Sequence, residues 1–281
     1  MWLFLGDSLT EGIGKWRVSY VSELVTMLRQ ESADPVHQMR LRRLDFSNAK
    51  DLSFFNLAGY VDHDPRESRT PHWILNLAAE GSTIRDDCLF EALLPACKIE
   101  RVFILRGPLE SIVRPYPIRD GCWPVWVPRS WRSYSALDPR CYFSAGPLRY
   151  AKQKMVDHAK QFIRLRLLVG GGAPIIPDVE FLDQYERLLN RVIGLGARVT
   201  ALAIPPVDGK VFPGTPEIVE RRNNAIRDLC AQYGVDCFSW NVAASVAPAT
   251  LFCRDGFHPS ELGAKQFAQQ LMRYLHQVSL R

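Results

Sequence analysis

The chain has 281 residues, of which 47% are hydrophobic, and this suits one large α/β domain better than two small ones. Its net charge of +5 comes without a dense block of lysine and arginine, the densest cluster being Arg40-Leu41-Arg42-Arg43, so nucleic acid is not expected as a partner. No run of about 18 apolar residues occurs, and a membrane span is not expected either.

The number and spacing of the cysteines bear on the cellular compartment and on metal binding. There are seven, and no two form a C-x-x-C pair, which argues against a zinc site or a redox motif. An odd number of thiols without regular spacing is typical of a reducing compartment. The first predicted strand begins at residue 2, which leaves no room for a signal peptide before it. We therefore expect a cytoplasmic protein without metal or cofactor.

Short apolar strands alternate with amphipathic helices along the chain, as a parallel α/β sheet requires. An apolar run at 2–5 indicates a buried strand, and apolar residues then recur at helical spacing from Val18 to Leu28. Residues 32–51 are polar and are expected to be irregular. Further strands are predicted at 52–57, 73–77, 101–106, 199–204 and 235–238, and further helices at 84–94, 181–192, 217–233 and after a cap at Ser260. The pattern predicts a three-layer α/β/α sandwich with a mostly parallel sheet of five or six strands, as one domain over residues 1–281.

The segment from residue 108 to about residue 150 departs from this alternation. It carries eight aromatic residues with many prolines and arginines, and it is too long for an ordinary connection. One hypothesis is a lid or substrate platform that includes Trp123 and Trp126, because aromatic faces and arginines suit sugars and anionic groups. The other is an insertion whose aromatic residues form a satellite core. Its position after the 101–106 strand slightly favours the lid.

Two short motifs near opposite ends of the chain carry the candidate chemistry. In Gly6-Asp7-Ser8-Leu9 the serine stands at the carboxyl end of a predicted parallel strand, where α/β sheets place their ligands. Asp255-Gly256-Phe257-His258 supplies a general base and an orienting carboxylate. A serine hydroxyl needs such a base to act as a nucleophile, and Ser, Asp, His is a known chain order for a triad. The alternative is a serine that caps a helix and a histidine held in a turn.

With these motifs in this order, the chain resembles the GDSL/SGNH family of serine hydrolases over nearly its full length. The resemblance implies a flavodoxin-like sandwich and ester cleavage, with Ser8 as nucleophile, His258 as base and Asp255 as the orienting residue. It also implies an oxyanion hole formed by the Ser8 N–H and by a glycine N–H after another strand. Gly81 is preferred for that glycine, and Gly59 is the competing candidate.

The chain departs from the family where an asparagine supplies the third oxyanion donor. Arg106-Gly107-Pro108-Leu109-Glu110 has a leucine there, which cannot donate a hydrogen bond. The block extended to Arg114 resembles one in SGNH-like proteins of bacterial surface-polysaccharide gene clusters. That resemblance implies Arg114 as a substitute donor, Glu110 as structurally important and an acylated glycan as substrate. Asp7, Arg106 and Glu110 are candidate substrate-binding residues, and the alternative is a surface pair of Glu110 with Arg114.

These observations favour a serine esterase that removes an O-acyl group, such as acetyl, from a carbohydrate through a Ser8 acyl-enzyme. An acyltransferase would share the first half-reaction and pass the acyl group to a sugar hydroxyl. A third hypothesis is a protein that kept the fold and binds a glycan or a partner without catalysis. The acyl chain, the acceptor and the oligomeric state stay open.

Overall fold

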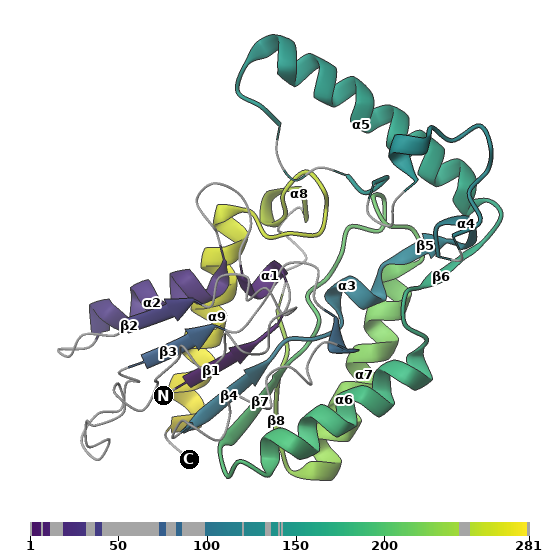
Figure 1. Cartoon of the computed structure of the whole chain (residues 1–281). Coiled ribbons are helices and arrows are strands. Elements are labelled where there is room, and N and C mark those ends of the chain that lie inside the picture. Colours follow the sequence, from purple (N-terminus) through teal and green to yellow (C-terminus); the bar gives the residue numbers. More distant parts are fainter. Residues whose placement is uncertain are drawn as a thin grey trace, which may run out of the picture.

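The computed structural model describes residues 2–6, 8–11, 19–31, 37–40, 73–76, 83–85, 99–119, 121–132, 136–139, 141, 143–241 and 248–279. They form a central parallel sheet with helices on both faces (Figure 1). The sheet order is β2-β3-β1-β4-β7-β8. The strands are β1 Trp2–Leu5, β2 His37–Arg40, β3 Trp73–Asn76, β4 Arg101–Ile104, β7 Arg198–Leu202 and β8 Asp236–Phe238. The predicted three-layer sandwich is confirmed.

Helices cover the sheet in two groups, and short elements connect them. On one face α2 (Tyr20–Glu31) packs against α9 (Glu261–Ser279), and on the other α6 (Asp178–Ile193) packs against α7 (Thr215–Tyr233). The predicted cap of the last helix is confirmed, because Ser260 Oγ accepts a hydrogen bond from the Gly263 N–H at 3.0 Å. The remaining elements of this part of the fold are α1 (Ser8–Glu11) and α8 (Pro248–Leu251).

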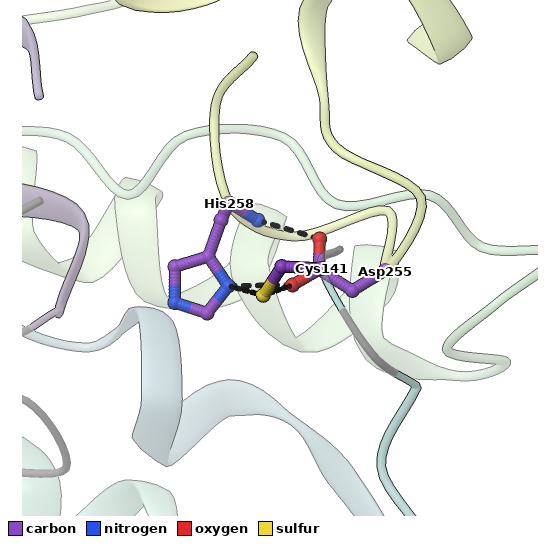
Figure 2. Close-up of side chains that lie close together, drawn as sticks. All are labelled: Cys141, Asp255 and His258. Atoms are coloured by element: carbon purple, nitrogen blue, oxygen red, sulfur yellow. Dashed lines mark hydrogen bonds and ion pairs between the residues drawn. The ribbon is translucent and has the colours of Figure 1, made fainter. Parts of the chain in front are cut away.

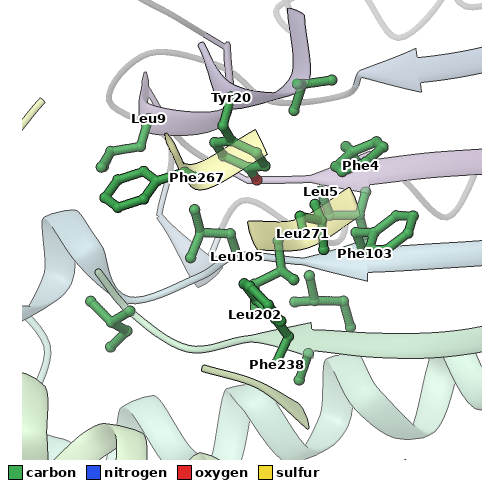
Figure 3. Packing of buried hydrophobic residues seen from close by; sticks show 14 of the residues in the cluster. Phe4, Leu5, Leu9, Tyr20, Phe103, Leu105, Leu202, Phe238, Phe267 and Leu271 are labelled. Atoms are coloured by element: carbon green, nitrogen blue, oxygen red, sulfur yellow. The ribbon is translucent and has the colours of Figure 1, made fainter. Parts of the chain in front are cut away.

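The core lies between the sheet and these helices, and its centre is aromatic (Figure 3). All residues of β1 and β4 are buried, and Phe4 stacks on its register partner Phe103 with ring centroids 4.4 Å apart. Tyr20 of α2 meets the edge of Phe4 at 6.3 Å, and Phe267 and Leu271 of α9 are buried in the same cluster. The two strands that precede the candidate site residues are therefore held by the best-packed part of the protein.

The sequence-based prediction of an irregular segment at 32–51 is wrong for β2. His37–Arg40 pairs in parallel with β3 and is an edge strand of the sheet. Backbone pairing along one edge does not need an apolar run, so composition gives no signal for it. The predicted strand at 52–57 lies outside the described residues, as does most of the predicted helix at 84–94, of which Ile84 and Arg85 form a 3₁₀ turn.

After β4 the chain leaves the sheet and does not rejoin it until β7, which follows α6. This region contains α3 (Pro108–Ser111), α4 (Tyr116–Arg119), the 3₁₀ helix η5 (Arg129–Trp131) and the long helix α5 (Pro147–Leu168). Strand β5 (Val113–Pro115) pairs antiparallel with β6 (Gly172–Pro174). The sequence analysis did not predict α5, which projects from the body in Figure 1. None of the described helices is long and apolar enough to cross a membrane.

The aromatic residues of this region are divided between a small core and the surface. Ile118, Leu137 and Leu167 form a second buried cluster, against which Trp123, Trp131 and Ile163 pack. Trp126, in contrast, is 58% exposed. The satellite core is therefore present, with Trp123 part of it, while Trp126 is available at the surface. A mobile lid stays a prediction.

Candidate active site

The carboxyl ends of β1 and β4 meet at the centre of the sheet. Strand β1 lies between β3 and β4, so the strand order changes direction here, and such a switch point is where open α/β sheets bind ligands. Arg106, two residues after β4, donates from Nη1 to the Gly6 carbonyl oxygen after β1 at 2.6 Å. Gly6 has no room for a side chain, because a Cβ there would lie 2.1 Å from Thr10 Oγ1. Ser8 follows as the first residue of α1.

The other motif lies in a tight loop between α8 and α9. An isolated bridge joins Phe252 to Pro259, and the Cys253 N–H donates to the His258 carbonyl at 2.7 Å. Gly256 has a φ of 66°, in the left-handed region that favours glycine. Its carbonyl accepts a hydrogen bond from the Asp208 N–H at 2.9 Å, which ties the loop to the segment after β7. The loop therefore holds Asp255 and His258 in one conformation.

Both oxygens of the Asp255 carboxylate are occupied (Figure 2). Oδ1 accepts the backbone N–H groups of Phe257 and His258, each at 3.1 Å, and Oδ2 lies 2.6 Å from His258 Nδ1. Burial acts to raise the pKa of Asp255, but the hydrogen bond and charge of His258 outweigh it and hold that pKa below its usual range. An ionised carboxylate can only accept, so Nδ1 donates, and the neutral imidazole carries its acceptor at Nε2. In Figure 2 that second nitrogen lies on the side of the ring away from Asp255.

A third side chain, Cys141, completes this cluster and was missed by the sequence analysis. It comes from the segment between η5 and α5, and its Sγ lies 2.7 Å from Asp255 Oδ2 and 3.3 Å from His258 Nδ1. Burial, followed by the charge of Asp255, raises the pKa of the Cys141 thiol, so the thiol is protonated and donates to the carboxylate. The region inserted after β4 thus reaches the Asp255–His258 pair.

Cys141, Asp255 and His258 are also the residues best suited to hold a metal. Within the described residues they form the one such group, with their ligand atoms within 4.8 Å of one another. Thiolate, imidazole and carboxylate are all zinc ligands. Binding would require the protons on Cys141 and on His258 Nδ1 to leave first, because metal ligands bind deprotonated. A metal here would therefore replace the hydrogen bonds that orient the imidazole.

Arg106 and Glu110 lie beneath the carboxyl end of the sheet rather than at its surface. Both side chains are 0% exposed, so the alternative of a surface pair between Glu110 and Arg114 is wrong. Glu110 Oε1 accepts the Ile84 N–H at 2.7 Å. Burial raises the pKa of Glu110, and the charge of Arg106 is the strongest effect that opposes it. The structure thus places these two predicted substrate-binding residues where they position backbone around the switch point.

The remaining predicted site residues divide into those the structure places and those it does not. Arg114 is 1% exposed in β5, and its Nη1 lies 2.7 Å from Asp138 Oδ2, so the proposed oxyanion donor is held by an ion pair to the inserted region. Trp126 is exposed, as described above. Gly81, its competitor Gly59 and Asp7 lie outside the described residues.

Replacing Glu110 with glutamine is expected to change how stability depends on pH. Folding raises the pKa of Glu110 above its ordinary value of 4.5, so the folded protein keeps the carboxyl proton to a higher pH than the unfolded chain does. The stability that this proton contributes is complete below pH 4.5 and is lost as the pH rises through the folded pKa. Glutamine keeps an acceptor for the Ile84 N–H and does not titrate. The unfolding free energy of the native protein should therefore fall relative to Glu110→Gln as pH rises above 4.5. Denaturant titrations across pH 4 to 9 measure this, and a constant difference between the two proteins would contradict it.

Comparison with known proteins supports the fold. No family model and no curated protein sequence matches the chain. Among solved structures it is similar to a lipase/acylhydrolase from Enterococcus faecalis, with a TM-score of 0.52, 14% identity and coverage of 98% of this chain and 94% of that one. It is also similar to Axe2, an acetylxylan esterase from Geobacillus stearothermophilus, with a TM-score of 0.52, 15% identity and coverage of 98% and 93%. The chain therefore has the same fold as these two solved enzymes, an α/β/α sandwich with a central parallel sheet.

Proposed function

We propose that the protein is a serine ester hydrolase in which Ser8, His258 and Asp255 act as a triad. The observation that carries the proposal is the 2.6 Å hydrogen bond between Asp255 and His258 Nδ1, which leaves Nε2 as the basic nitrogen. Solved variants of Axe2 that are called catalytic mutants replace a serine, an aspartate and a histidine, with the last two three residues apart. Asp255 and His258 have the same spacing, and Ser8 has the same place at the start of the order.

In the proposed reaction the Ser8 hydroxyl attacks the ester carbonyl while His258 Nε2 takes its proton. Asp255 keeps the imidazole in the required tautomer and stabilises the imidazolium that forms. The oxyanion is bound by the Ser8 N–H, because the first N–H groups of a helix have no intrahelical acceptor, and by the Gly81 N–H that the resemblance to the GDSL/SGNH family implies. His258 then protonates the leaving alcohol, and a water attacks the acyl-enzyme by the same route. Cys141 acts as a positioning residue through its bond to Asp255.

For the substrate we propose an O-acyl ester of a carbohydrate. The similarity to an acetylxylan esterase supports this class, and the exposed face of Trp126 offers a surface for a sugar ring. None of the cysteines among the described residues is in a disulfide, which supports our proposal of a reducing compartment such as the cytoplasm. Product analysis with an acetylated oligosaccharide, with and without added sugar acceptor, distinguishes hydrolysis from acyl transfer. Free acid that forms at the same rate in both reactions indicates hydrolysis.

A fluorophosphonate probe tests the nucleophile directly. We expect one covalent adduct on the native protein by intact mass, because the probe reacts only with a serine that a neighbouring base activates. Ser8→Ala should abolish the adduct. Ser239→Ala, at an exposed serine directly after β8, should keep it and serves as the matched control. An adduct that still forms on Ser8→Ala would contradict the assignment of Ser8 as the nucleophile.

A further inference from the structure

Helix α5 carries a stripe of exposed apolar residues along its length. Leu148, Met155, Phe162 and Val169, the last of them its C-cap, are 88%, 69%, 72% and 78% exposed. They recur at intervals of seven residues, which is close to two turns, so they lie on one side of the helix. Leu165 adds to the same side and is 44% exposed. Single exposed apolar residues are common, but a row of five on one helix is not.

The opposite side of α5 is fixed to the protein, so the exposed stripe is not the helix's attachment to the body. Leu167 is buried in the satellite cluster, and Arg164 is 1% exposed. The Arg164 guanidinium lies 4.3 Å from the ring centroid of Phe212 and donates to the Val211 carbonyl at 3.1 Å. The helix is thus held through its C-terminal half while the residues of the stripe are exposed, and α5 itself lies at the edge of the molecule in Figure 1.

The exposed charged side chains of α5 are all basic. Arg149, Lys152, Lys154 and Arg166 are exposed, whereas Asp157, the one acidic residue of the helix, is 7% exposed and belongs to the buried side. At 100° per residue, Lys152 and Arg166 border the apolar stripe on one flank, and Lys154 borders it on the other. An apolar stripe between basic flanks is the pattern of helices that lie in the surface of an anionic bilayer.

This charge pattern argues against a second copy of the chain as the occupant. If two α5 helices packed antiparallel through their stripes, Lys152 would approach Arg166 of the partner subunit, and a parallel pair would bring each basic residue close to its own equivalent. Like charges at such positions are repulsive, and the exposed side of α5 has no carboxylate to balance them. The basic residues that flank the stripe are complementary instead to a negatively charged surface.

We propose that α5 docks in the plane of an anionic lipid surface, with its apolar stripe at the boundary of the acyl chains. Lys152, Lys154 and Arg166 would then contact lipid phosphates, and the rest of the protein would stay in water. The docking is peripheral and needs no spanning segment. It does not depend on the proposed hydrolase activity.

Flotation with lipid vesicles tests the docking. The native protein should float with vesicles of equal parts phosphatidylglycerol and phosphatidylcholine and should stay in solution with pure phosphatidylcholine. A basic amphipathic helix needs both the insertion of its apolar residues and the attraction of its basic residues to anionic lipids. The double variant Met155→Gln/Phe162→Gln should lower the bound fraction at least ten-fold, and so should Lys152→Glu/Arg166→Glu. Val179→Gln, at an 84% exposed valine on α6, is the matched control and should bind like the native protein.

Two further measurements distinguish a lipid surface from other partners that could cover the stripe. The variant Phe162→Trp adds an eighth tryptophan to the chain's seven, and the difference between its fluorescence and that of the native protein should shift to the blue with anionic vesicles. Circular dichroism should show that each variant is folded. A native protein that ignores both vesicle types overturns the proposal. So does a native dimer that Met155→Gln/Phe162→Gln converts to a monomer, which would assign the stripe to a second copy. Binding that Val179→Gln weakens as much as the α5 variants would also overturn it.

Discussion

His258→Ala is expected to lower kcat by about 10⁶-fold, the scale seen when the base of a serine hydrolase triad is removed. The reason is geometric. His258 Nδ1 is held by the Asp255 carboxylate, so the basic nitrogen is Nε2, whereas His158 and His276 are hydrogen-bonded to a backbone carbonyl and to a glutamate. Alanine leaves the Ser8 hydroxyl without a proton acceptor. Steady-state hydrolysis of an activated ester such as p-nitrophenyl acetate measures the loss, and circular dichroism checks the fold.

Two companion variants make this result specific. Asp255→Asn should lower kcat by about 10⁴-fold, because an amide no longer fixes the imidazole in the tautomer with a basic Nε2. His276→Ala should leave kcat unchanged, since His276 is 60% exposed on α9 and pairs with Glu31. Equal activity of His258→Ala and His276→Ala would show that Asp255 and His258 serve only to shape the loop before α9.

The parts of the fold that sequence predicts are those whose signal is local and apolar. Strands β1, β4 and β7 were predicted because each contains a run of mostly apolar residues that the sheet buries, and α6 was predicted because its buried residues recur at helical spacing. Strand β2 has no such run, since it pairs at the sheet edge through its backbone. Helix α5 was missed because its apolar residues are mixed with basic ones on the exposed side, which weakens the contrast between its two faces.

The same distinction explains the candidate site. Asp255 and His258 are three residues apart, so one turn brings them together, and the motif predicts their contact. Cys141 lies 114 residues from Asp255, and its contact depends on how the inserted region folds back. The burial of Glu110 and Arg114 was also not predictable, because charged residues are mostly exposed unless a distant partner compensates them. Those partners, Arg106 and Asp138, are identified only by the structure.

Arg106 joins the core to the candidate site, and Arg106→Met is expected to weaken both. The Gly6 carbonyl would lose its donor, and the fully buried Glu110 would lose the cation that most lowers its pKa. Removing one partner of a buried charge pair costs about 3–5 kcal/mol of unfolding free energy. The loss should lie near the lower end, because Glu110 can take up a proton. Urea unfolding at neutral pH measures it.

The double variant Arg106→Met/Glu110→Gln separates the charge from the hydrogen bond to Gly6. If the burial of an uncompensated Glu110 causes most of the loss, the double variant should be more stable than Arg106→Met alone, and the two effects should not add. Its kcat should still be low, because Gly6 lies two residues before Ser8 and its carbonyl has lost the donor that fixes it. Arg101→Met is the matched control for activity, since Arg101 is a nearly buried arginine at the opposite end of β4 that lies over Trp2. Additive losses of stability, or a normal kcat in the double variant, would show that Arg106 does not act through Glu110 and Gly6.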